Sequence, residues 1–314
     1  MIRFRRFNRR HLDFEFSAHN DFKIRIIERP GLWMSEKESK EMLVDLQSVV
    51  ENCLGKAPLE YGILSGAKTR LDNAIVTILY ERRTRRPIAF NAMSVMSIEV
   101  EDQPIDVIHL GLAMIDPGSR RQGLSWVLYG LTCTLLLLRN HCRPLWISNV
   151  TQIPSVVGHV TESLANVFPT PDPQNKRTST HLAIAREIMR HHRSVFGVGE
   201  DAGFDEDRFV ITNSYTGGSD NLKKTFVEAT KHRDESFNLM CKEQLKYERG
   251  DDFLQIGQFN LRVAVGSLLR LVPRVSPPLA HAQPAFAFLR SIFSPALRWL
   301  TSSSQNGGLG RCKL

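Results

Sequence analysis

The stretch "HLGLAMIDPGSRRQGLSWVLYGL", residues 109–131, joins an apolar strand to a leucine-rich helix through a short polar hinge. The first turn of a helix exposes unpaired backbone N–H groups and the positive end of the helix dipole, and both attract phosphate. Arg120 and Arg121 add charge-assisted donors, and Gly123 lets the backbone approach a ligand where a Cβ atom would clash. The hinge therefore predicts a site for a phosphate-bearing ligand. The alternative is an ordinary turn with solvated arginines.

The residues before the hinge predict one helix and several strands. Ser35 and Glu38 stand at the positions of a capping box, and Gly55 stands where the helix would end. The β-rich segments are 22–34, 74–83, 87–100 and 105–115. Polar turns separate the last three of them, which predicts three strands in antiparallel succession.

The residues after the hinge complete a mixed α/β pattern. The segments expected are a helix over 123–138, a strand over 144–150, a helix over 154–168, a polar loop over 168–180, a strand over 208–215, a helical or partly irregular insert over 221–245 and a last strand over 251–259. This order predicts a mixed, mainly antiparallel sheet with flanking helices. The strand-to-helix crossover at 109–138 is expected to join two neighbouring parallel strands, and we call this place the parallel point of the sheet.

The composition fits a globular protein in a reducing setting. The chain has 314 residues, of which 42% are apolar, enough for one large domain or two small ones. Its five cysteines are scattered and form no CxxC pair, which argues against a zinc cage or a disulfide framework and favours the cytoplasm. We see no apolar run typical of a signal peptide or of a membrane-spanning helix.

The net charge of +8 is concentrated at the two ends of the chain. Residues 1–12 hold five arginines, and residues 253–314 hold six arginines and one lysine; neither segment holds an acid, so residues 13–252 carry −4. Basic ends on a mildly acidic body favour an anionic surface. Specific nucleic-acid binding is disfavoured because no aromatic–basic platform accompanies the arginines.

These shifts in composition predict three parts. They are a basic extension over 1–21, a globular domain over 22–260 and a basic, amphipathic C-terminal tail over 261–314. Within the tail, "AFAFLRSIFSPALRWL" (285–300) places basic residues on one helical face and apolar residues on the rest, a pattern typical of a helix lying in a membrane interface. The alternative is a helix packed on the domain or on a second subunit of an oligomer.

The hinge resembles the cofactor signature of the GNAT acyltransferase superfamily, in which a strand ends in apolar-x-Pro and Arg/Gln-x-x-Gly-x-Gly/Ala opens a helix. The matching residues are Ile115, Asp116, Pro117, Arg120, Gly123 and Ser125. Ser125 departs from the Gly or Ala of the pattern and would slightly restrict the approach of a pyrophosphate. The element order is similar to that of the family over about residues 22–260.

The resemblance implies an acyl-CoA-dependent N-acyltransferase, with acetyl-CoA or a longer acyl-CoA as co-substrate, an amine as acceptor and no metal. Backbone groups of the strand would pair with the pantetheine arm, and N–H groups of the hinge would hold the pyrophosphate. The residues implied in cofactor binding are Met114, Ile115, Arg120, Arg121, Gln122, Gly123, Leu124, Ser125 and Asn149. Asn149 is included because it ends the strand on which the family often keeps an asparagine.

The residue that would protonate the leaving thiolate is not obvious. Many members of the family use a tyrosine on the helix after the fifth strand, and residues 154–168 contain none. His159 is the candidate in its place because imidazole ionises near neutral pH, and His109 is a candidate base. Each could instead be an ordinary solvated or packed histidine, and a non-catalytic binding or scaffolding protein of the same fold is the alternative function. Specificity for the acceptor would lie in the 170s loop and in the insert at 216–250.

Overall fold

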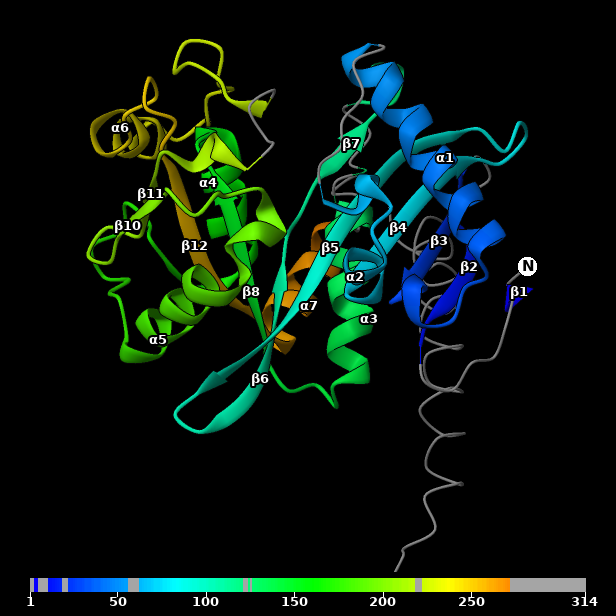
Figure 1. The fold of residues 1–314 in the computed structure, drawn as a ribbon, viewed down its shortest axis with the longest axis horizontal. Helices are drawn as coiled ribbons and strands as arrows, with labels where there is room; N and C mark the ends of the chain where they lie inside the picture. Colours follow the sequence, from blue (N-terminus) through cyan, green and yellow to red (C-terminus); the bar gives the residue numbers. More distant parts are fainter. Residues whose placement is uncertain are drawn as a thin grey trace, which may run out of the picture.

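The computed structural model of the chain describes residues 3–4, 11–18, 22–55, 62–120, 124, 126–217 and 222–271. Within these residues a twelve-stranded sheet forms the centre, in the order β1-β2-β3-β4-β5-β6-β8-β12-β11-β10, with β7 beside β5 and β9 beside β12 (Figure 1). The strands are β1 (Arg3–Phe4), β2 (Asp13–Ala18), β3 (Phe22–Glu28), β4 (Ala74–Glu81), β5 (Pro87–Val100), β6 (Gln103–His109), β7 (Ala113–Ile115), β8 (Leu145–Thr151), β9 (Ala165–Phe168), β10 (Gly203–Asp205), β11 (Val210–Thr212) and β12 (Asp252–Phe259). The helices are α1 (Glu36–Leu54), α2 (Lys68–Asp72), α3 (Thr132–Arg139), α4 (Pro154–Ser163), α5 (Ser179–Glu187), α6 (Glu235–Gln244) and α7 (Leu261–Leu271).

The sheet is mixed and mainly antiparallel, as the sequence predicts. Among the described residues every strand pair is antiparallel except β6 with β8, where Ile108 lies opposite Ile147 and His109 opposite Ser148. The hinge and α3 connect these two strands, so the predicted parallel point is confirmed.

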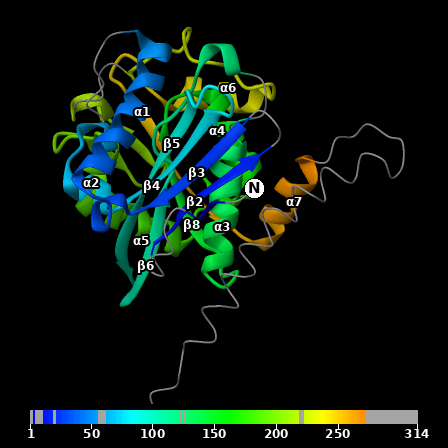
Figure 2. The ribbon, with the colours of Figure 1, turned by 90° about the vertical axis from the view of Figure 1, so that its right-hand side faces the viewer.

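Helices cover the two faces of the sheet in separate groups. Neighbouring residues of a strand point to opposite faces, and on β4 Val76 packs in the core cluster of α1 whereas Ile75 packs in that of α3. On β6, Val107 packs with α5 and Ile108 with α3. We therefore call the two sides the α1 face, which also holds α5, and the α3 face. Figure 2 shows α1 and α2 on one side of the sheet and α3 and α7 on the other.

The same alternation on β12 places α4 and α6. Phe253 packs with residues of α4 and α6, whereas Leu254 packs with residues of α5. Helices α4 and α6 therefore lie on the α3 face, and the two faces meet different cores.

Helix α1 follows the signals in its sequence. The Ser35 hydroxyl accepts from the Glu38 N–H while the Glu38 carboxylate accepts from the Ser35 N–H, which makes the predicted capping box. Gly55 ends the helix with φ 78°, a conformation that glycine adopts without strain. The helix buries Met42, Leu46, Val49 and Val50 against the sheet.

Three of the elements expected from the sequence have different bounds in the structure. The predicted strand over 22–34 ends at Glu28, because Pro30 begins a short 3₁₀ turn. The predicted helix over 154–168 ends at Ser163, and its last residues form β9 against β12. Helix α5 (Ser179–Glu187) begins within the polar loop predicted over 168–180 and continues into residues for which the sequence analysis assigns no element; a Thr178–His181 capping interaction begins it.

Two segments that the sequence analysis places outside the globular domain pack against it in the structure. Residues 13–18, placed in the N-terminal extension, form β2 and pair with β3. Residues 261–271, placed in the tail, form α7, which packs against α3 and buries Ala264 in the core of the α3 face. The segment 285–300 lies outside the described residues. No helix of the described part is long and apolar enough to cross a membrane.

Candidate active site

The parallel strands β6 and β8 run together only briefly and then separate. Their pairing extends from Val107 to His109, with one further hydrogen bond of 2.8 Å from the Leu110 N–H to the Ser148 carbonyl. Beyond this point β7 follows β5, and β8 follows β12. Figure 1 shows the two groups of strands diverging from their meeting point near β6. The sheet is therefore split on the carboxyl side of its parallel pair.

An irregularity at Gly111 turns the chain into β7. The sequence predicts one strand over 105–115, but residues 110–112 interrupt it: Ser94 of β5 lies opposite His109, whereas Asn91 lies opposite Ala113. Three steps along β5 thus match four steps along its partner, which is a β-bulge. A Cβ atom at position 111 would lie 2.1 Å from the Ala92 carbonyl oxygen, so the close approach requires glycine.

Backbone polar groups line both walls of the split. The Asp116 N–H donates to Ile88 and the Ala92 N–H to Leu112. Because an antiparallel ladder alternates between bonded and non-bonded pairs, the backbone groups of Ala113 and Ile115 point away from β5 and into the split.

The opposite wall follows the same rule. On β8 the Ser148 carbonyl faces β6, so the N–H and C=O groups of Val150, two residues on, face the opening. The Ile115 carbonyl accepts from Cys53 Sγ and from Arg120 Nε, each at 3.3 Å, so its expected pairing with the cofactor arm stays a prediction. For Met114 the register directs the backbone groups toward β5, and its side chain lies in the α1-face core.

A cavity of about 670 Å³ occupies the split and is lined from both faces of the sheet. On the α3 face the lining includes Tyr129, Asn149, Val156 and His159. On the α1 face it includes His109, Phe196, Tyr215 and Asp252. The cavity therefore lies at the split and is lined by side chains from both faces of the sheet.

The structure gathers some of the predicted site residues at this cavity. His109, Ile115, Asn149 and His159 line it. Arg120 is exposed at the hinge and donates from Nε to the Ile115 carbonyl at 3.3 Å, whereas Leu124 is buried in the core of the α3 face. Arg121, Gln122, Gly123 and Ser125 lie outside the described residues, so their roles stay predictions.

Asp116 organises the hinge, a role that the sequence analysis does not assign. Its Oδ1 accepts from the Gly118 N–H at 2.9 Å, and its Oδ2 accepts from Arg86 Nη1 at 2.8 Å. Asn52 of α1 donates to the same Oδ2 at 3.3 Å. The carboxylate thus ties the hinge to β5 and α1. The Asp-Pro-Gly sequence is a signal for such a turn.

The two candidate histidines occupy different settings. His109 is buried, its Nδ1 lies 3.1 Å from the Ser148 hydroxyl, and its ring centroid lies 4.9 Å from that of Phe196. Burial lowers the pKa of His109 to about 3, so the imidazole is neutral and holds a proton only weakly. His159 is exposed on α4, on the α3 face of the cavity.

Asn149 lies on the α3 face, where its side-chain amide is hydrogen-bonded to Gln255 of the neighbouring strand β12. Its Nδ2 donates to Gln255 Oε1 at 3.3 Å, and the Gln255 amide in turn donates to the Val157 carbonyl of α4. Asn149 also lines the cavity. Its predicted contact with the cofactor arm stays a prediction.

Asp252 and Tyr215 form a hydrogen-bonded pair in the cavity wall that the sequence analysis missed. The Tyr215 hydroxyl donates to Asp252 Oδ1 at 3.2 Å. Burial raises the pKa of Asp252 to about 7, despite hydrogen bonds from Ser214 and Tyr215 that lower it. The sequence signal was an acid at the start of an otherwise apolar strand.

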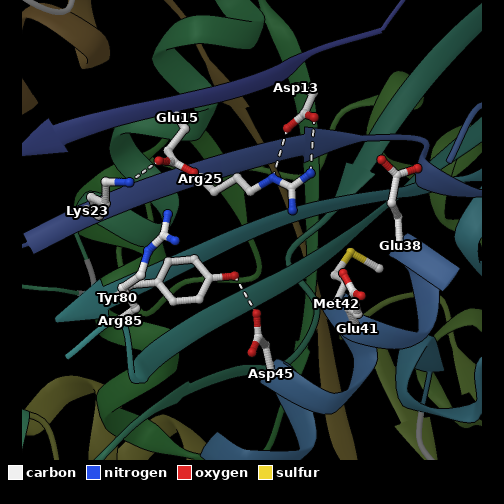
Figure 3. A pocket seen from close by; sticks show the side chains of 10 residues that line it. All are labelled: Asp13, Glu15, Lys23, Arg25, Glu38, Glu41, Met42, Asp45, Tyr80 and Arg85. Atoms are coloured by element: carbon white, nitrogen blue, oxygen red, sulfur yellow. Dashed lines mark hydrogen bonds and ion pairs between the residues drawn. The ribbon is translucent and has the colours of Figure 1, made fainter. Parts of the chain in front are cut away.

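A second cavity, of about 540 Å³, lies on the α1 face between α1 and the edge strands β2, β3 and β4 (Figure 3). Two ion pairs lie within it: Arg25 donates to both carboxylate oxygens of Asp13 at 2.9 and 3.0 Å, and Lys23 pairs with Glu15. The Tyr80 hydroxyl donates to Asp45 at 2.7 Å. The strands are continuously paired here, so we interpret this cavity as a group of ion pairs at the sheet edge.

No protein-family model and no curated protein sequence matches the chain. Solved structures that are similar include the ribosomal-protein-S5-alanine acetyltransferase from Vibrio fischeri, at 15% identity, covering 43% of this chain and 74% of that chain with a TM-score of 0.30. Another is a GNAT family acetyltransferase from Brucella melitensis in complex with acetyl-CoA, at 13% identity, covering 40% of this chain and 74% of that chain with a TM-score of 0.27. At these TM-scores the likeness carries no argument by itself. The chain is thus similar in part to GNAT-family acetyltransferases, and its function has to be argued from the geometry of the split sheet.

Proposed function

We propose that the protein is an acyl-CoA-dependent N-acyltransferase. The observation that carries the proposal is the split between β7 and β8, whose two walls direct backbone N–H and C=O groups into a cavity that is lined from both faces of the sheet. Backbone groups that no strand satisfies favour a ligand that carries amides and can lie between the strands. The pantetheine arm of CoA is such a ligand.

The position of the hinge agrees with the same ligand. It follows β7 directly and leads into the helix on the α3 face, so a pyrophosphate at the hinge would leave the pantetheine arm beside Ile115 and Ala113. Arg120 is exposed there and available to a phosphate. The thioester would then reach the point where the strands separate.

Acyl transfer at this point needs a donor for the developing oxyanion and groups that move protons. The Ala113 N–H faces the split and would donate to the thioester oxygen. His159, on the α3 face, would protonate the departing thiolate. The amine forms a C–N bond to the acyl carbon while the C–S bond breaks, and the products are an amide and free CoA. A longer acyl chain would also find apolar lining in the cavity.

Filling the α3-face side of the split tests the proposal. Ala113→Trp should abolish binding of acetyl-CoA in calorimetry, because Ala113 lines the cavity and the indole would fill its α3-face side. Val44→Trp is the matched control, since Val44 is exposed on α1, away from the cavity. Equal affinity of acetyl-CoA for Ala113→Trp and for the control would place the cofactor elsewhere.

The basic tail leads to a finer proposal, that the enzyme works at an anionic membrane surface. Each basic residue near such a surface contributes about 1 kcal/mol, and buried apolar side chains add to it. Because α7 belongs to the body, the truncation should begin after Leu271. Full-length protein should float with vesicles containing phosphatidylserine, and the truncated protein should not. Equal flotation of the two would exclude the tail as the anchor.

A further inference from the structure

The second cavity, between α1 and the strands β2, β3 and β4, is separate from the split, and we call it the edge cavity (Figure 3). Among the described residues no side chain lines both cavities. The edge cavity has a volume of about 540 Å³, within the range of small-molecule sites, roughly 300–1,000 Å³. Eight of its ten lining side chains carry a charge at neutral pH. A ligand that fits there would itself be charged.

The strand wall of the edge cavity holds donors that its ion pairs do not use. Arg25 Nε and Nη2 both donate to Asp13. The third guanidinium nitrogen, Nη1, makes no hydrogen bond within the described residues, and Figure 3 shows it pointing into the cavity. Arg85 lines the same wall from the turn between β4 and β5 and forms no ion pair with a described residue. Two guanidinium groups are thus available to an anionic group of a ligand.

The opposite wall belongs to α1 and holds carboxylates. Glu41 and Asp45 lie four residues apart, so they are neighbours on the helix surface. Within the described residues neither of them forms an ion pair. Asp45 accepts a hydrogen bond from the Tyr80 hydroxyl at 2.7 Å, and Glu38, which caps α1, lines the same wall. Like charges at this spacing repel one another, and a cation between them would relieve the repulsion.

The two walls together fit a ligand that carries both charges. Guanidinium groups bind carboxylates through paired N–H donors, so the strand wall suits a carboxylate. An ammonium group has three donors and no acceptor, so the α1 wall suits an ammonium. A ligand with only a positive charge would leave the Nη1 donors of Arg25 unused. A ligand with only a negative charge would face the acids of α1.

We propose that the edge cavity is a binding site for a small zwitterion that carries one ammonium group and one carboxylate, as an amino acid does. Arg25 Nη1 and Arg85 hold the carboxylate. Glu41 and Asp45 hold the ammonium group from the opposite wall. The site lies apart from the split, so the inference does not depend on the proposed acyltransferase function.

Calorimetry of the full-length protein tests the proposal with zwitterions of three lengths. The probes are glycine, 4-aminobutyrate and 6-aminohexanoate, each compared with the alkylamine and the alkanoate of the same number of carbons. At least one zwitterion should bind about tenfold tighter, or more, than both of its singly charged analogues, because a hydrogen bond to a charged group contributes about that factor. If none of the three zwitterions binds, the proposal is wrong. An alkylamine that binds as tightly as the zwitterion of its length would indicate a plain cation site and would also overturn it.

Substitutions on the two walls test the two ends of the ligand. Asp45→Asn removes a charge from the α1 wall and keeps an acceptor for the Tyr80 hydroxyl, and it should weaken binding of the zwitterion about tenfold. Glu36→Gln is the matched control, because Glu36 is exposed on the same helix and does not line the edge cavity. Equal affinity of the zwitterion for Asp45→Asn and for this control would exclude the α1 wall.

Arg85→Asn removes a charge from the strand wall, and asparagine tolerates the φ of 63° at this position. Its affinity for the zwitterion should fall to that for the alkylamine. Arg83→Asn, an exposed change in the same turn outside the lining, should bind like wild type. A retained preference for the zwitterion in Arg85→Asn would remove Arg85 from the site.

A last comparison separates the edge cavity from the split. Ala113→Trp, which fills the other cavity, should bind the zwitterion like wild type. Loss of zwitterion binding by this variant, when urea unfolding shows that it is folded, would place the ligand in the split. Binding of acetyl-CoA is not a readout of this inference, so failure here and failure of the proposed function are distinguishable.

Discussion

Replacing Asp252 by asparagine should stabilise the folded protein, and the gain should grow with pH. Burial raises the pKa of this carboxyl from its ordinary 3.8 to about 7. The folded state therefore holds the proton more tightly than the unfolded state, and the free energy of unfolding of the wild type falls as pH rises from 3.8 to about 7. Over the whole interval this difference amounts to about 4 kcal/mol. Asparagine is neutral at every pH in this range, so the variant does not undergo this loss of stability.

Urea unfolding of wild type and Asp252→Asn between pH 5 and pH 8 measures this effect. The advantage of the variant should increase by about 2–3 kcal/mol across this range and should level off above pH 7, with similar m-values for both proteins. Asp205→Asn, whose carboxylate pairs with Arg208 at the surface, should show no such rise. A stability difference that is constant or that falls with pH would refute the raised pKa of the buried Asp252 carboxyl.

Three further predictions concern the split and its histidines. Gly111→Ala should lower the free energy of unfolding by about 1–3 kcal/mol, because the new Cβ would meet the Ala92 carbonyl oxygen; Gly266→Ala, a helical glycine with open space around it, is the control and should be neutral or stabilising. Burial lowers the pKa of His109 from 6.5 to about 3, so wild type should lose about 1.4 kcal/mol of stability per pH unit below 6.5, and His109→Gln should lose less in the same urea series. His159→Ala should lower turnover roughly 10²- to 10⁴-fold with unchanged acetyl-CoA affinity in calorimetry; unchanged turnover would remove His159 from the mechanism.

Elements whose signals are local could be predicted from the sequence. Helix α1 follows from the Ser35–Glu38 cap, its apolar spacing and Gly55, and these interactions all lie within the helix or next to it. The parallel point follows from the crossover through the hinge, since a strand joined to the next by a helix returns in the same direction. The hinge therefore lies where the crossover was predicted, between β7 and the helix that leads to β8.

Features that depend on distant partners could not be predicted. The sequence predicts one continuous strand over 105–115. The interruption at residues 110–112 becomes visible only in the register of this segment against β5. The sequence pattern of α4 continues over residues 165–168 and predicts a helix there. In the structure these residues form a strand because they pair with β12. Asp252 and Tyr215 are 37 residues apart, and no spacing rule joins them. The predicted candidates were His109, on the strand before the hinge, and His159, on the helix after β8, whereas Asp252 lies on β12, for which the sequence analysis assigns no site residue.

The absence of a tyrosine on α4 has a different meaning once the two faces are distinguished. A tyrosine there would stand on the α3 face, the side of the departing thiolate, and His159 is the ionisable side chain of α4 that lines the cavity from that side. The tyrosine that does line the cavity beside an acid, Tyr215, stands on the α1 face. His159 and the Asp252–Tyr215 pair thus line the cavity from opposite faces of the sheet, and substitutions of His159 and Asp252 probe the two sides separately.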